Sequence, residues 1–137
     1  MSADFSNLST LQHSIPLDQA AAMTRRYREN KTLILQPQYA PEILALCETF
    51  NKDGIVALAN NPVAVGIRIY YGMDQDLLVH AILVGVDAQG ADILPPQATA
   101  STARRVAADD DDDDDDIQED AIRCPPTCPP ESPLNGG

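Results

Sequence analysis

Apolar residues alternate with polar or small ones between residues 63 and 87, and this pattern predicts a β-hairpin. The first strand places apolar side chains at every second position, and a second apolar strand follows the polar stretch 72–76. One face of the hairpin is therefore wholly apolar, and we expect helices to cover it. In the first strand this face carries Val63, Val65, Ile67, Ile69 and Tyr71.

The hairpin register follows if residues 72–76 form a five-residue loop. Tyr71 then lies opposite Leu77, and Arg68 lies opposite His80 on the more polar face. A slip of one residue would separate Arg68 from His80 and expose the apolar face. The position of the turn therefore decides whether the two ionisable side chains meet.

Arg68, Tyr70 and His80 form the predicted binding site on this polar face. Arginine offers a fixed fork of donors for a carboxylate or phosphate, and histidine changes charge near neutral pH. The residues suit a small anion or a protein partner. The commoner alternative is a solvated sheet face on which Arg68 keeps His80 neutral. No Ser, Cys or carboxylate is placed beside His80 by spacing, so no catalytic residues are predicted.

Three helices are predicted around the hairpin. The first begins at Pro16 or Leu17 and ends near Lys31. The second covers 41–50, where apolar residues fall at i, i+1, i+4 and i+7 and Cys47 is assigned to packing. The third covers 55–61 after an N-cap at Asp53. With a short strand at 91–94, the prediction is an α+β fold with about three helices packed on a small antiparallel sheet.

The domain organisation follows from composition along the chain. Residues 1–14 are polar and are predicted to form a flexible N-terminal arm. Residues 15–96 are predicted to form a single α+β domain. Residues 97–116 end in eight consecutive aspartates that repel one another, so a disordered acidic linker is expected there. Residues 117–137 form a Cys/Pro-rich tail that can dock on the domain.

Charge and hydropathy exclude several classes of partner. Residues 1–108 carry eight Lys/Arg against ten Asp/Glu, a balance of −2, whereas 109–137 carry one Arg against eleven Asp/Glu, a balance of −10. An acidic chain is unsuited to nucleic acid or anionic lipid. No signal peptide and no membrane span are visible, and three cysteines do not form a secreted disulfide framework. These observations predict a cytoplasmic protein.

Cys124 and Cys128 form a C-x₃-C pair and are candidates for a metal site or a disulfide. A structural zinc site uses four ligands, commonly from two such pairs, and the chain has one. Zinc within one chain or shared by two chains is therefore a minor alternative, and no cofactor is predicted. A disulfide or thiol switch is a further alternative, as are cysteines that only orient the tail. The aspartate run lacks the ligand spacing of an EF-hand, so specific calcium binding is not expected.

Three stretches carry a resemblance: GIRIYYG, VHAILVGV and the ending RCPPTCPPESPLN. In these the chain resembles a group of small bacterial proteins with no established activity. The resemblance covers 15–94 and 117–135 and implies no site. It does imply that the Cys/Pro end belongs to the protein proper.

The function predicted from these features is a small, non-enzymatic binding or assembly module that acts through its sheet face or edge. A small sheet leaves strand edges that need covering, and pairing with a second copy in a homodimer would cover them. The first alternative is a metal- or thiol-dependent protein that uses the C-x₃-C tail. A weaker alternative is an enzyme for a small anionic substrate that uses Arg68, Tyr70 and His80.

Overall fold

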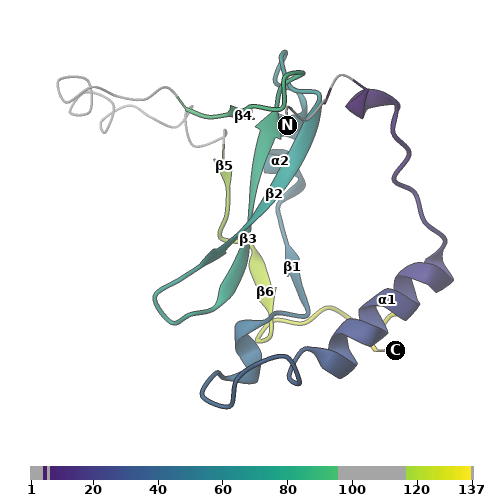
Figure 1. Ribbon diagram of the computed structural model, residues 1–137, viewed down its shortest axis with the longest axis vertical. Helices are drawn as coiled ribbons and strands as arrows, with labels where there is room; N and C mark the ends of the chain where they lie inside the picture. Colours follow the sequence, from purple (N-terminus) through teal and green to yellow (C-terminus); the bar gives the residue numbers. More distant parts are fainter. Residues whose placement is uncertain (1–4, 6, 96–116, 137) are drawn as a thin grey trace. The chain divides into compact units, whose positions relative to one another are not determined.

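The predicted hairpin is present in a chain of α+β class (Figure 1). A computed structural model describes residues 5, 7–95 and 117–136; the linker predicted at 97–116 lies outside these residues. The described chain has two α-helices and two antiparallel sheets. It divides into two compact units. The first comprises Met1–Leu11, Phe50–Tyr71 and Ala81–Asp120, and the second comprises Gln12–Thr49, Gly72–His80 and Ala121–Gly137.

The sheet of the first unit is built on β3 (Val79–Val86), whose last six residues belong to this unit. β2 (Gly66–Met73) pairs with β3 as the other arm of the hairpin. β4 (Asp92–Ile93) pairs with the end of β3, where Gly85 is the Cα partner of Ile93. β5 (Ile117–Gln118) pairs with the preceding residues of β3, where Val84 is the partner of Ile117. Strands from three parts of the sequence therefore meet on β3.

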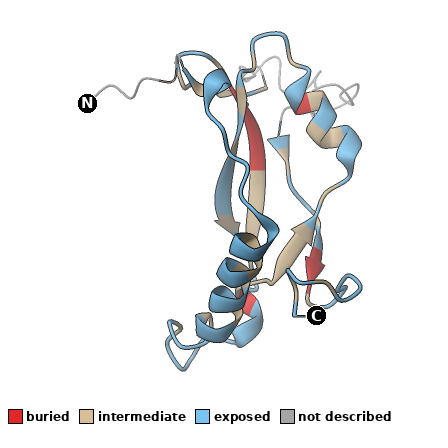
Figure 2. Ribbon diagram, turned by 90° about the vertical axis from the view of Figure 1, so that its right-hand side faces the viewer, coloured by how far each residue is buried: buried red, intermediate tan, exposed pale blue. Residues whose placement is uncertain are grey.

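The core of the first unit lies between β3 and α2 (Lys52–Ala59). Its buried apolar side chains are Leu58, Leu83, Val84 and Val86, and the end of β3 is red in Figure 2. The N-cap of α2 is Asn51, whose side chain accepts a hydrogen bond from the Asp53 N–H at 3.0 Å. The predicted cap at Asp53 is therefore wrong by two residues. Asp53 lies instead in the first turn, where its charge favours the exposed N–H groups.

Two residues of the predicted N-terminal arm contact this sheet. The Phe5 ring lies 5.4 Å from the Arg68 guanidinium carbon. It also fills the space at Gly90, where a Cβ atom would collide with the ring and where φ is +84°. Leu8, in the 3₁₀ turn η1 (Leu8–Thr10), lies against Gly66 in the same way. Gly66 in β2 and Gly90 in the turn before β4 thus leave space for apolar side chains of the arm.

The second unit contains a two-stranded sheet where a helix was predicted. After a 3₁₀ turn, η2 (Pro41–Ile43), the chain becomes extended and forms β1 (Cys47–Thr49). β1 pairs antiparallel with β6 (Ile122–Cys124), more than seventy residues along the chain. The helix predicted at 41–50 is therefore wrong. Its spacing of apolar residues fits a helix locally, but a partner strand from the C-terminus satisfies the backbone instead.

The helix α1 (Leu17–Asn30) begins as predicted and has no buried residue. Polar side chains link it to other segments of the second unit. The Tyr27 hydroxyl donates to the Ala45 carbonyl oxygen at 2.6 Å, Arg28 donates to the Leu134 carbonyl oxygen at 2.7 Å, and Lys31 just beyond the helix donates to the Pro41 carbonyl oxygen at 2.9 Å. The prediction of about three helices packed on the sheet is thus corrected to two α-helices, of which only α2 contributes a buried side chain.

The predicted hairpin register is wrong at the turn. The Asp74 N–H donates to the Leu78 carbonyl oxygen at 3.0 Å. In an antiparallel pair, residues joined in this way have the same sum of residue numbers as the residues directly opposite each other. The turn therefore closes at Asp74 and Leu78, and the predicted five-residue loop at 72–76 is wrong.

The Asp74 side chain is the reason for the later turn. Its carboxylate accepts hydrogen bonds from the N–H groups of Asp76 at 2.9 Å and Leu78 at 3.0 Å. Leu77 completes the turn with a φ of +68°. An aspartate whose side chain bonds to the backbone two and four residues further on fixes a turn independently of the hydropathy of the flanking strands.

Candidate functional site

Arg68 and Tyr70 both contact Asp92, a carboxylate that the sequence did not place with them. Arg68 donates to Asp92 Oδ1 at 2.6 Å and to the Gly90 carbonyl oxygen at 3.0 Å. The Tyr70 hydroxyl donates to the other oxygen, Asp92 Oδ2, at 2.6 Å. β2 is thereby tied to β4 and the turn before it, all within the first unit.

This arrangement changes what Arg68 can do. The hydrogen bond from Tyr70 and the charge of Arg68 hold the pKa of Asp92 below its ordinary value against the opposing effect of burial. Asp92 therefore stays ionised and keeps the Arg68 fork occupied. A small anion would have to displace a carboxylate already held by two donors, so the geometry favours a structural role for this pair.

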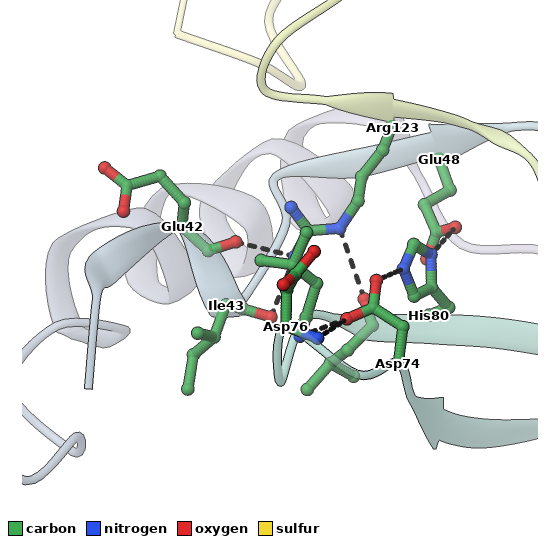
Figure 3. Close-up of polar contacts among 9 residues, drawn as sticks. Glu42, Ile43, Glu48, Asp74, Asp76, His80 and Arg123 are labelled. Carbon is green, nitrogen blue, oxygen red and sulfur yellow. Dashed lines mark hydrogen bonds and ion pairs between the residues drawn. The ribbon is translucent and has the colours of Figure 1, made fainter.

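His80 lies in the second unit with partners of its own (Figure 3). Its Nε2 atom is 2.7 Å from Asp74 Oδ2, and its Nδ1 atom is 3.4 Å from Glu48 Oε2. The ring thus bridges the turn of the hairpin and β1. Within the first unit Asp92 joins Arg68 and Tyr70, and within the second unit two carboxylates hold His80.

The two carboxylates favour the protonated imidazole. The hydrogen bond that His80 donates to Asp74 raises the pKa of His80 above 6.5, burial lowers it, and the contact with Glu48 raises it again. In return, the hydrogen bond from His80 lowers the pKa of Asp74. The alternative of a solvated sheet face predicted a neutral His80 beside Arg68. The structure instead places it between acids, where the charged form is stabilised.

Arg123 on β6 is a buried charged residue near this cluster (Figure 3), with an exposed fraction of 8%. It donates to the carbonyl oxygens of Glu42 at 2.6 Å, Ile43 at 2.8 Å and Val79 at 3.3 Å. One guanidinium thus joins β6 to two other backbone segments of the second unit, 42–43 and the start of β3. This is a structural role, since each contact is to a carbonyl oxygen that would otherwise lose its hydrogen bond on burial.

Cys124 and Cys128 are joined by a disulfide with a Cα–Cα distance of 4.7 Å. In this state neither sulfur is a thiolate, which is the form that binds zinc. Among the described residues, no group of three or more His, Cys, Asp and Glu side chains is arranged to hold a metal ion. Zinc binding by these cysteines would therefore require reduction of the disulfide and a rearrangement of the chain.

The face of β2 that was predicted to be covered is exposed. Ile67 is 39% exposed, Ile69 53% and Tyr71 79%, and they alternate along one side of the strand. The expectation that helices cover this face is wrong for β2, because α2 is only eight residues long and buries its apolar side chain near the end of β3. The result is a row of apolar side chains, which we call the β2 face.

Four residues of these clusters were missed by the sequence analysis: Glu48, Asp74, Asp92 and Arg123. For Asp74, a signal existed in the turn chemistry of an Asp followed by polar residues. For the others, the partner is far along the chain; Arg123 and Glu42 are 81 residues apart. No local pattern indicates such a pairing.

Comparison with known proteins gives no family for the chain. No protein-family model, no curated protein and no solved structure matches it. In the part of the chain that the structure describes, no helix has the length and apolar character needed to cross a membrane. The resemblance to a group of small bacterial proteins therefore stays a prediction.

Proposed function

We propose that the protein is a non-enzymatic assembly module that forms a homodimer by pairing β2 with β2 of a second copy. The observation that supports this is the β2 face, three exposed apolar side chains at alternate positions of an eight-residue strand. β2 pairs with β3 along one side and with no other strand among residues 5, 7–95 and 117–136. Its other edge is available for a partner strand.

The edge of β2 lacks the features that prevent strand addition. Native proteins protect edge strands with lysine, proline, bulges or inward-pointing charges. β2 contains no Lys and no Pro, and its one charged residue, Arg68, is neutralised by Asp92. An edge of this kind supports backbone pairing with another strand, the mode of recognition known as β-augmentation.

A second copy of the chain fits this edge better than an unrelated strand because the β2 face is symmetric about Ile69. Antiparallel pairing centred there sets Ile69 opposite its own copy and Ile67 opposite Tyr71 of the other chain. On the reverse side Arg68 faces Tyr70, so no like charges oppose each other. Two-fold pairing of identical strands is also the commonest symmetry of soluble oligomers.

The dimer is expected to be weak. Fully burying one such side chain contributes about 1.5–3 kcal/mol, and these are about half exposed, so six of them give on the order of 5–9 kcal/mol. Association costs about 4–15 kcal/mol. The gain and the cost are of similar size, so the dimer depends on backbone hydrogen bonds between the two edges.

The test is light scattering on a size-exclusion column over a dilution series, with Ile69→Lys as the disrupting variant. A lysine on each copy at the centre of the pairing buries charge at a cost of several kcal/mol, which corresponds to at least about a hundredfold weaker dimer. The wild type should be dimeric at high concentration and Ile69→Lys monomeric throughout. Ile34→Lys is the matched control, because Ile34 is 73% exposed and lies outside the sheets. A wild type that is monomeric at every concentration, or a variant that stays dimeric, contradicts the proposal.

We propose no nucleic-acid partner, no membrane partner and no cofactor, and the proposed location is the cytoplasm. The charge balance of −10 in 109–137 supports the first two points. If the location is cytoplasmic, the Cys124–Cys128 disulfide is of particular interest, because cytoplasmic disulfides are usually transient and redox-active.

A further inference from the structure

All three cysteines of the chain lie together in the second unit. Cys47 on β1 is the Cα partner of Cys124 on β6, directly across the two-stranded sheet. Cys124 is in turn bonded to Cys128, and Cys47 is not disulfide-bonded. The sequence pattern predicted that Cys47 packs as part of a helix. The strand pairing instead makes it the neighbour of a disulfide.

The geometry brings Cys47 within reach of Cys124. Directly opposed residues of an antiparallel pair have Cβ atoms about 4.5–5.5 Å apart. A disulfide requires a Cβ–Cβ distance of about 3.5–4.5 Å, so a movement of roughly 1 Å is sufficient. The adjacent backbone keeps the strands in place, since the Leu46 N–H donates to the Cys124 carbonyl oxygen at 2.8 Å.

The three sulfurs differ in access to solvent. The Cys124 residue is 1% exposed, Cys47 is intermediate and Cys128 is exposed. A small molecule therefore meets Cys128 most readily, whereas Cys124 is reached from within the protein. Cys124 is the one residue with both other cysteines as neighbours.

We propose that Cys47, Cys124 and Cys128 form a thiol–disulfide exchange site in which Cys124 is the shared sulfur and Cys128 is the thiol delivered to solvent. Cys47 loses its proton to solvent, and its thiolate attacks the Cys124 sulfur. A Cys47–Cys124 bond forms, the Cys124–Cys128 bond breaks, and the electron pair leaves on Cys128. One thiolate is consumed and one is produced, so this step needs no oxidant.

The ligand of the exposed Cys128 thiolate is a small disulfide such as oxidised glutathione. Cys128 attacks one sulfur of that disulfide, forms a mixed disulfide with it and releases the other half as a thiolate. This site uses β1 and β6 and is independent of the β2 face, so the two proposals stand or fall separately.

The first test traps the exchanged bond in two matched variants. Cys128→Ser leaves Cys47 and Cys124, which are strand partners, and Cys124→Ser leaves Cys47 and Cys128, which are not. In a glutathione buffer, Cys128→Ser should form its intramolecular disulfide at least about tenfold faster, because strand pairing raises the effective concentration of one sulfur at the other. In concentrated guanidinium chloride the difference should disappear. Equal rates in the folded variants overturn the proposal. Circular dichroism of both variants checks that they fold, and a Cys128→Ser variant that folds but forms no bond also overturns it.

The second test uses the wild-type chain and so does not depend on a variant that folds. The protein is treated with oxidised glutathione, quenched in acid, alkylated and digested with trypsin. Cleavage after Lys52 and Arg123 separates Cys47 from the other two cysteines. We expect glutathione on Cys128 together with a cross-linked peptide pair that joins Cys47 to Cys124. Glutathione on Cys47 with the Cys124–Cys128 bond intact overturns the proposal, as does the absence of any adduct.

Discussion

At the residue scale, the pKa and the role of an ionisable side chain depend on its partners from other elements. Arg68 and His80 stand out in the sequence because they are charged or titratable in an apolar stretch. Their environments follow from Asp92 for Arg68, and from Asp74 and Glu48 for His80. The separation in sequence is 24 residues for Arg68 and Asp92 and 32 for His80 and Glu48. A charge can thus be recognised from sequence, whereas its pKa and its role depend on contacts that folding creates.

His80 makes stability depend on pH in a definite direction. Because the folded-state pKa of His80 is raised above 6.5, its stabilising contribution is fully present below pH 6.5. It is lost as pH rises through the folded-state pKa. His80→Gln should therefore destabilise the protein at acidic pH by up to about 1 kcal/mol and converge on the wild type at alkaline pH.

Thermal melts of both proteins across this pH range measure the effect. His13→Gln is the control, because His13 is exposed and lies outside the carboxylate cluster. A wild type and a His80→Gln variant whose melting temperatures differ by a constant amount at all pH values would contradict the assignment of His80.

At the element scale, hydropathy patterns identified the elements that are stabilised locally. The hairpin, the start of α1 and the existence of α2 were predicted, although α2 begins earlier than expected. Cys47–Thr49 was predicted to be helical and is a strand, because β6 supplies its hydrogen-bond partner. Residues 117–124, predicted as part of a tail, contribute one strand to each sheet. Short strands of two or three residues carry too little pattern to be recognised alone.

The C-terminal strands should accordingly be needed for folding. Removing residues 117–137 deprives β3 of β5, β1 of β6, and the second unit of Arg123 and the disulfide. We expect this truncation to abolish cooperative thermal unfolding, measured by circular dichroism. The full-length chain with Asp109–Asp116 replaced by serine is the control and should melt like the wild type. A truncated protein with an unchanged thermal unfolding transition would show that β5 and β6 contribute little to stability.

At the scale of the whole molecule, the small number of buried apolar side chains is the main feature. Among the described residues these are Ile43, Leu58, Leu83, Val84, Val86 and Cys124. Folding stability is a small difference between large terms, so an exposed apolar row such as the β2 face has a large effect if a partner covers it. Assembly would then contribute directly to the stability of the chain.

The melting temperature should therefore depend on protein concentration. If two copies pair through β2, each tenfold increase in protein concentration above the Kd adds about 1.4 kcal/mol to the unfolding free energy of the dimer, or about 0.7 kcal/mol per chain, through mass action. The wild-type melting temperature should fall on dilution, and that of Ile69→Lys should remain constant. Calorimetry over this range measures both. A wild-type melting temperature that does not change with protein concentration would argue against self-association. This measurement is independent of light scattering.

The sequence by itself determined what depends on neighbours along the chain: the α+β class, the hairpin with its alternating faces, and the helix α1 that begins at Leu17. Side-chain periodicity and residue propensity act over a few residues, so these elements are visible before folding. The tertiary structure alone decided which carboxylates hold Arg68 and His80, which strand Cys47 joins, and that the β2 face is left exposed. Each of these depends on segments distant in sequence, whose pairing is selected by backbone hydrogen bonds and burial across the whole fold.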